Sequence, residues 1–222
     1  MSLNYADFAQ AKNKMANFFN LFSRKSEKTV NKERMGGELH LFFLVECSSG
    51  MAGDKIGMIN SFFRTLLDKL SQLSPTEKFV CDKIMIRVIS IASEAWWHIG
   101  PNGASVENAS WSDLIAGGGR NAAEAMEMLY KALVYNGSFD VPPMIFFITA
   151  NAPCTDETAP NYKTSVQKLN ESLFGPWNRR YSIVLGMEGE AVHEEIASFS
   201  SDRLQLDAGE AAHLIETAMK EG

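Results

Sequence analysis

The stretch LHLFFLVECSSGMAGD, residues 39–54, decides the fold. Residues 39–45 form an almost unbroken apolar run, which is typical of a β-strand that is covered on both faces. The run ends at Glu46, two serines and a glycine, and apolar residues at helical spacing follow from Ile56 onward. The polar loop between this strand and helix has three readings: it binds a metal ion, it carries a nucleophile, or it keeps the shape of a site without either.

Strand patterns and helix patterns alternate along the rest of the chain. Strands are predicted at 39–45, 83–91, 141–149, 181–186 and 203–206, and helices at 56–70, 121–134, 166–173, 190–197 and from Asp207 onward. The segment SEAWWHIG (93–100) is predicted to pair antiparallel with the second strand at the sheet edge, where Trp96 and Trp97 pack. This order predicts a three-layer α/β/α, Rossmann-like fold with a mostly parallel central sheet and one antiparallel edge strand. Sites in such sheets lie beyond the carboxyl ends of the strands.

The composition limits the kinds of partner and the compartment. The net charge of −6 argues against nucleic acid or an anionic membrane as the main partner. No apolar run approaches the roughly 20 residues that span a bilayer, and the first residues do not resemble a signal peptide. Three widely spaced cysteines without metal-ligand spacing fit reduced thiols, so a cytoplasmic location is expected.

Residues 1–36 differ from the remainder and are predicted to form an amphipathic helix followed by a linker. Phe8, Met15, Phe18 and Phe22 recur at helical spacing, and a polar, charged stretch follows them. This helix is expected to pack on its own domain, on a partner or second copy, or on a membrane surface. Residues 37–222 are predicted to form the main domain.

Three loops at strand ends can converge: ECSSGM (46–51), GGGRN (117–121) and TANAP (149–153). With the order of elements, they resemble a von Willebrand factor type A (vWA) domain over residues 38–219. In that family the loops form a metal-ion-dependent adhesion site (MIDAS) from Asp-x-Ser-x-Ser-Met, a Thr in a Gly-rich run and Thr-Asp-Gly. The site holds a divalent cation, usually Mg²⁺, which binds an acidic residue of a partner. Within the family, the chain looks similar to compact bacterial cytoplasmic members linked to tellurite resistance and stress.

The resemblance implies a degenerate MIDAS. The family's ligand positions fall on Glu46, Ser48, Gly50, Arg120 and Ala150. Because Mg²⁺ requires an octahedral set of oxygen ligands, the loss of side-chain oxygens at Gly50 and Ala150 argues against a bound metal. Arg120 is predicted to stand in for the cation by pairing with Glu46, with Ser48 as a further acceptor. No cofactor is expected. The alternative is Mg²⁺ bound through substituted ligands.

The function implied by the resemblance is non-catalytic binding of another protein, independent of a divalent cation. The predicted recognition surface, here called the crest, comprises Glu46, Cys47, Ser48, Ser49, Gly50, Arg120, Ala150 and Asn151. One alternative is a Mg²⁺- or Mn²⁺-dependent adhesion-type binding protein that uses substituted ligands, for which Asp54, Asp113 and Asp156 are candidates.

The other alternative is a hydrolase that uses Ser48 or Cys47. The residues argue against an enzyme, because Glu46 stands where the Gly-x-Ser-x-Gly turn needs glycine, and its charge disfavours a thiolate at Cys47. The histidines, His40, His98, His193 and His213, do not follow strand ends as a hydrolase histidine would.

Overall fold

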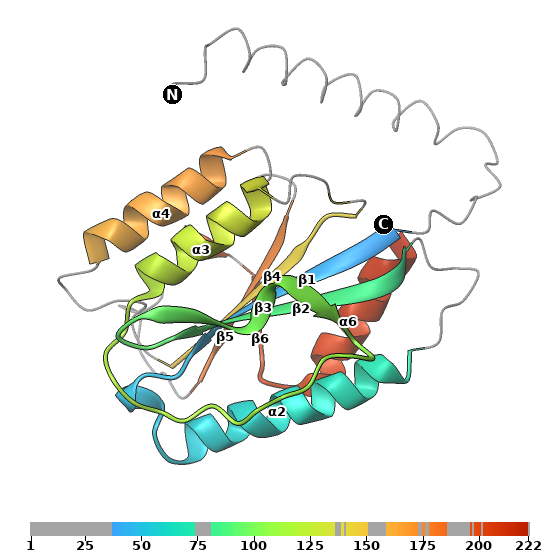
Figure 1. The fold of residues 1–222 in the computed structure, drawn as a ribbon, viewed down its shortest axis with the longest axis horizontal. Coiled ribbons are helices and arrows are strands. Elements are labelled where there is room, and N and C mark those ends of the chain that lie inside the picture. Colours follow the sequence, from blue (N-terminus) through green and yellow to red (C-terminus); the bar gives the residue numbers. More distant parts are fainter. Residues whose placement is uncertain are drawn as a thin grey trace, which may run out of the picture. The chain divides into compact units, whose positions relative to one another are not determined.

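The computed structural model describes residues 37–73, 81–135, 139, 141–150, 159–172, 175, 178–185, 196, 198–200 and 202–221 (Figure 1). The chain divides into two units, Met1–Met35 and Gly36–Gly222. The helix predicted within residues 1–36 lies outside the described residues. All that follows concerns the second unit.

A six-stranded sheet runs through the centre of this unit. Its strands are β1 (Gly37–Glu46), β2 (Cys81–Ile91), β3 (Ala95–Ser105), β4 (Met144–Thr149), β5 (Arg179–Val184) and β6 (Asp202–Leu204). The spatial order is β3-β2-β1-β4-β5-β6. All neighbouring pairs are parallel except β2 with β3. The predicted parallel sheet with one antiparallel edge strand is therefore confirmed.

Helices cover both faces of the sheet (Figure 1). One face carries α2 (Asp54–Ser71) and α6 (Ala208–Glu221), and the other carries α3 (Ala122–Tyr135) and α4 (Ala159–Glu171). A short 3₁₀ turn, η1 (Ser49–Met51), connects β1 to α2. None of the helices in the described ranges is long and apolar enough to cross a membrane.

The apolar run of β1 lies at the middle of this three-layer arrangement. Leu41 and Phe43 pack in the core beneath α2 and α6, whereas Phe42 and Leu44 pack in the core beneath α3 and α4. The ring of Phe43 stacks on that of Phe146 in β4, with 4.8 Å between ring centroids. Alternate side chains of β1 are thus buried on opposite faces, which explains why the strand carries no polar face.

Several predicted boundaries differ from the structure, among them those of the fourth and the last strand. The fourth strand begins at Met144 rather than at residue 141, because Pro142 and Pro143 have no N–H to donate to a neighbouring strand. The last strand ends at Leu204 rather than at residue 206. The helix predicted at 190–197 lies almost wholly outside the described residues.

The final helix starts where its capping signal predicts. The Asp207 carboxylate accepts a hydrogen bond from the backbone N–H of Glu210, at 2.8 Å between Oδ1 and N. This bond satisfies one of the free N–H groups in the first turn of α6.

Candidate functional site

The carboxyl ends of three neighbouring strands meet at one edge of the sheet. Glu46 of β1 lies in register with Ile91 of β2, and Val45 lies in register with Ile148 of β4. The chain leaves β1 through Cys47, whose backbone N–H donates to the Ile91 carbonyl at 2.8 Å. Because β1 lies between β2 and β4, the loop after it emerges at the switch point where α/β proteins place their sites.

The Glu46 carboxylate points inward at this edge and is 2% exposed. It accepts hydrogen bonds from the Thr149 hydroxyl at 2.6 Å, from the Ala150 backbone N–H at 3.0 Å and from the Ser48 hydroxyl. Hydrogen bonds of this kind to an ionised carboxylate are stronger than neutral ones and offset the cost of burying the charge. Glu46 therefore joins the loop after β1 to the end of β4.

The predicted pair of Glu46 and Arg120 is wrong. Among the hydrogen bonds and ion pairs of the described residues, none connects these two side chains. The Glu46 carboxylate instead accepts from donors on its own loop and at the end of β4, and Arg120 is half-buried in the Gly-rich run. Ser48, predicted as an acceptor for Arg120, instead donates its hydroxyl to Glu46.

The Gly-rich run binds the loop after β1 through its backbone. Gly117 N–H donates to the Cys47 carbonyl at 2.9 Å, and Ser49 N–H donates to the Gly118 carbonyl at 3.0 Å. The Ser49 hydroxyl donates to the same Gly118 carbonyl at 2.9 Å. These bonds fix the first two of the three predicted loops against each other, as the sequence led us to expect.

Ser93, in the turn between β2 and β3, was not predicted as part of the site. Its hydroxyl accepts a hydrogen bond from Gly119 N–H at 2.7 Å. Gly118 has φ +73°, and a Cβ there would lie 2.7 Å from the Ser93 oxygen, so glycine is required both for the backbone conformation and for the close approach. In the sequence, the only sign that Ser93 belongs to the site was its position in a tight turn, and a serine there also fits an ordinary hairpin.

The predicted crest residues divide into exposed and buried groups. Ser49 and Gly50 are exposed and Arg120 is half-buried. Four others are buried: Glu46, Cys47, Ser48 and Ala150. Asn151 lies outside the described residues. In the part of the crest that the structure describes, Ser49, Gly50 and Arg120 therefore have surface that faces solvent, while the other residues are buried.

Both candidate nucleophiles are buried at the carboxyl end of β1. Cys47 is fully buried, and its thiol donates to the Ile91 carbonyl at 3.5 Å. Burial raises the pKa of the Cys47 thiol to about 11, and the neighbouring negative charge of Glu46 adds to this, although the bond to Ile91 opposes it. The Ser48 hydroxyl is bonded to Glu46. At neutral pH the reactive thiolate of Cys47 is therefore a minor species.

Candidate metal ligands are dispersed. Among the residues that the structure describes, no group of three or more His, Cys, Asp or Glu side chains could hold a metal ion. Asp113 pairs with Arg64 of α2 instead, and Asp54 is an exposed residue in the first turn of α2. Asp156 lies outside the described residues.

Asn60 fastens the connecting segment, residues 106–116, to α2. Its buried amide donates to the Leu114 carbonyl at 3.0 Å, and its oxygen accepts from Leu114 N–H at 2.9 Å and from the Trp111 indole at 3.1 Å. Trp111 also stacks on Phe63 of α2 with 4.0 Å between ring centroids. Because this segment leads directly into the Gly-rich run, Asn60 sets the approach of that run to the crest.

No family model matches the sequence, and no curated protein matches it. The fold, in contrast, is similar to solved vWA structures. The vWF domain of the type V pili tip protein Mfa5 from Porphyromonas gingivalis has a TM-score of 0.58 at 8% identity, covering 84% of this chain and 98% of that chain. Manganese-loaded TRAP from Plasmodium vivax has a TM-score of 0.55 at 14% identity, and the match covers 83% of this chain and 74% of that chain.

A von Willebrand factor type A structure from Catenulispora acidiphila has a TM-score of 0.56 at 12% identity. The match covers 83% of this chain and 42% of that one, so this chain spans less than half of it. At such low identities the likeness is one of fold. The arrangement from β1 to α6, in which the loop after β1 is bonded to the Gly-rich run and to the end of β4, is the fold of a von Willebrand factor type A domain.

Proposed function

We propose that this chain is a non-catalytic protein-binding module of vWA type whose crest works without a bound cation. The observation that supports it is the Glu46 carboxylate, buried and hydrogen-bonded to Ser48, Thr149 and Ala150. In a MIDAS the corresponding oxygens coordinate an ion. Here the same edge of the sheet is joined by O–H and N–H donors that converge on a carboxylate.

The electrostatics of this arrangement disfavour a cation. To bind one, Glu46 would have to exchange hydrogen bonds in a buried position for metal coordination, while Mg²⁺ would lose part of its tightly held hydration shell. Gly50 and Ala150 provide no side-chain oxygen to complete the ligand set. A partner of such a crest does not need to present an aspartate or glutamate to a metal.

The fold neighbours support protein binding as the type of function. Mfa5 is a pili tip protein, and its vWF domain is similar in fold to nearly the whole of the described unit. The sequence identity of the Mfa5 domain to this chain is only 8%, so the binding partner of Mfa5 is not inferred to bind this chain. We further propose that the chain is not an enzyme, that it acts in the cytoplasm, and that it resembles in role the tellurite-resistance and stress-associated members of the family.

The crest is tested by affinity capture with the full chain, repeated in EDTA and in millimolar Mg²⁺. A specific partner is expected to bind equally in both buffers, because no cation takes part. Ser49→Arg and Arg120→Ala are each expected to weaken binding about tenfold, or 1.4 kcal/mol, because both residues have surface at the crest. The matched control is Ser61→Arg, on the exposed side of α2.

Two results would count against the proposal. Loss of the partner in EDTA would make binding metal-dependent. Equal binding by the Ser49, Arg120 and Ser61 variants would move the interface away from the crest.

A second candidate, metal-dependent binding, is favoured by one observation. The hydroxyls of Ser48 and Thr149 lie at the Glu46 carboxylate, so oxygens of three side chains are close together at the position where vWA domains bind their ion. The crystallised TRAP neighbour is manganese-loaded. Under this candidate the two hydroxyls would give up their bonds to Glu46 and turn toward the cation.

A further inference from the structure

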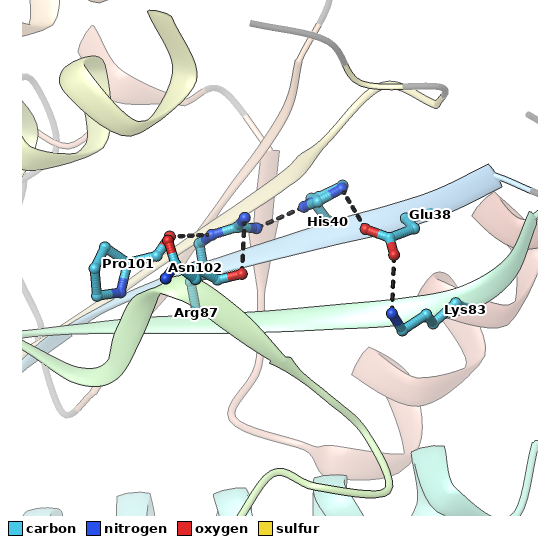
Figure 2. Close-up of polar contacts among 6 residues, drawn as sticks. All are labelled: Glu38, His40, Lys83, Arg87, Pro101 and Asn102. Carbon is cyan, nitrogen blue, oxygen red and sulfur yellow. Dashed lines mark hydrogen bonds and ion pairs between the residues drawn. The ribbon is translucent and has the colours of Figure 1, made fainter. Parts of the chain in front are cut away.

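A chain of polar and charged side chains crosses the sheet near the amino end of β1, at the other end of the strand from the crest (Figure 2). Arg87 of β2 contacts His40 of β1, with 2.5 Å between Nη1 and Nδ1. His40 Nε2 lies 3.4 Å from Glu38 Oε2, and Glu38 Oε1 accepts from Lys83 Nζ at 2.9 Å. This arrangement has no part in the crest and is partly buried, since Arg87 is 4% and His40 9% exposed.

Arg87 occupies an irregularity in the edge strand β3. The β2–β3 register passes from Ile86↔Ala104 to Val88↔Ile99, so residues 100–103 bulge opposite Arg87. The Arg87 guanidinium donates to the Pro101 carbonyl at 2.8 Å and to the Asn102 carbonyl at 3.3 Å (Figure 2). Two carbonyls of the bulge thus accept from this one cation, and a buried arginine without acceptors is costly.

The backbone of the bulge is shaped to the guanidinium. Gly103 has φ +75°, and a Cβ at this position would lie 3.3 Å from Arg87 Cζ. The other side of the guanidinium faces the Phe42 ring, with Cζ 5.0 Å from the ring centroid. Burial lowers the pKa of Arg87, and the charge of Glu38 opposes this. Arginine nonetheless stays charged in proteins, so it must keep its acceptors.

The contact with Arg87 selects one form of the His40 ring. A guanidinium has five N–H donors and no acceptor, so Nδ1 must accept the Arg87 hydrogen bond and cannot itself carry a proton. The ring is then neutral, with its proton on Nε2 toward Glu38. The edge of the Phe139 ring packs on the imidazole, with 4.9 Å between ring centroids.

The charges around His40 do not favour a further proton. Those from the described residues are Glu38 of β1 and Lys83 and Arg87 of β2, whereas Lys131 of α3 lines a separate pocket with Pro101. One carboxylate thus faces two cations, and it already accepts a hydrogen bond from Lys83. A proton on His40 would place a further cation against Arg87 and remove one of its acceptors.

We propose that Glu38, His40 and Arg87 form a proton-sensitive latch on the edge strand β3. While His40 is neutral, it holds Arg87 in the bulge of residues 100–103. A proton on Nδ1 breaks the contact with Arg87, and the bulge loses its internal cation. Pro101 lines a shallow pocket of about 240 Å³ with Trp97, Met128, Lys131, Ala132 and Tyr135, so acid changes the surface at this edge and leaves the crest unaltered.

The direction of the pH effect follows from the preferred form of the ring. Because the fold favours neutral His40, the folded chain takes up this proton at a lower pH than the unfolded chain. The latch therefore adds to the free energy of unfolding above the ordinary imidazole pKa of about 6.5, and this stabilisation declines as the pH falls below that value.

The latch is tested in the full chain by nuclear magnetic resonance at about pH 7.5 and about pH 5.5, on either side of the ordinary imidazole pKa. Long-range ¹H–¹⁵N spectra of His40 are expected to show the neutral, Nε2-protonated ring at the higher pH. Amide hydrogen exchange at Ile99 and Ala104, corrected for its intrinsic pH dependence, is expected to rise by up to about tenfold at the lower pH.

Two variants separate the proton from the contact. His40→Asn keeps an acceptor near the position of Nδ1 but does not titrate, so exchange at Ile99 and Ala104 is expected to stay slow at both pH values. His40→Ala removes the acceptor, so exchange is expected to be fast at both. His213→Asn, at an exposed position of α6, is the control. In this variant, exchange at Ile99 and Ala104 is expected to change with pH as it does in the native chain.

Either of two results would overturn the latch. The first is a doubly protonated His40 ring at the higher pH in the native chain, a measurement that requires no variant. The second is a His40→Asn chain whose exchange responds to pH as strongly as that of the native chain.

Discussion

Replacing Glu46 by alanine is expected to lower the free energy of unfolding by about 3–5 kcal/mol. The substitution leaves the Ser48 hydroxyl, the Thr149 hydroxyl and the Ala150 N–H without the acceptor that they share in a buried place. It also removes the link between the loop after β1 and the end of β4. Urea unfolding followed by circular dichroism at neutral pH measures the loss.

Two further variants show whether the acceptor oxygens or the charge matter. In Glu46→Gln the amide oxygen still accepts from Thr149 and Ala150, and the Ser48 hydroxyl can rotate to accept from the amide nitrogen, so a loss of about 1–2 kcal/mol is expected. The exposed Glu94→Ala is expected to change stability by less than about 0.5 kcal/mol. If Glu46→Ala lowered the free energy of unfolding as little as Glu94→Ala, the Glu46 carboxylate would not hold the loops together.

Replacing Asn60 by alanine is expected to cost about 2–4 kcal/mol, because three hydrogen bonds of one buried side chain are lost together. Leu114 N–H, the Leu114 carbonyl and the Trp111 indole all lose their partner. Since residues 106–116 lead into the Gly-rich run, the variant is also expected to weaken binding at the crest. Thermal unfolding and the affinity capture described above measure the two effects.

Arg64→Ala is the matched control for Asn60→Ala. Arg64 lies one helical turn further along α2 and pairs with Asp113 of the same connecting segment, but both side chains are about half exposed. An ion pair in water contributes about 1 kcal/mol or less. A loss for Arg64→Ala equal to that for Asn60→Ala would mean that the surface pair, rather than the buried amide, fastens the segment.

The fold could be predicted from the sequence because its main signals are local. The run at residues 39–45 has no polar face, and this alone requires a strand that is covered on both sides. Asp207, three residues before Glu210, marks the start of α6 through a bond between neighbours in the chain. The prolines at 142 and 143 misled the prediction of β4 by extending its apolar run beyond the residues that can pair.

The crest could be predicted only in part, because its contacts join residues distant in the sequence. That three loops converge follows from the parallel strands, whose carboxyl ends meet at one edge. The partner of Glu46 does not follow, since it accepts from Thr149 and Ala150, about a hundred residues away. Opposite charge made Arg120 an attractive partner, but the direction of the buried carboxylate decides the contact.

Ser93 and Asn60 were missed for a related reason. A serine in a tight turn is common, and its bond to Gly119 depends on how the hairpin of β2 and β3 lies against the Gly-rich run. Asn60 lies on the buried side of α2, where the helical pattern offers only its apolar neighbours as a signal. Side-chain bonds to a distant backbone leave no periodic trace in the sequence.

The central claim is that Glu46 and its donors hold the crest in place of a cation. It is tested most directly by the melting temperature of the full chain after treatment with EDTA, with and without millimolar Mn²⁺ or Mg²⁺. No shift is expected. A cation bound at 100 times its Kd would stabilise the fold by about 2.7 kcal/mol and raise the melting temperature by about 5–10 °C. A rise of that size, absent in Glu46→Gln, would contradict the claim.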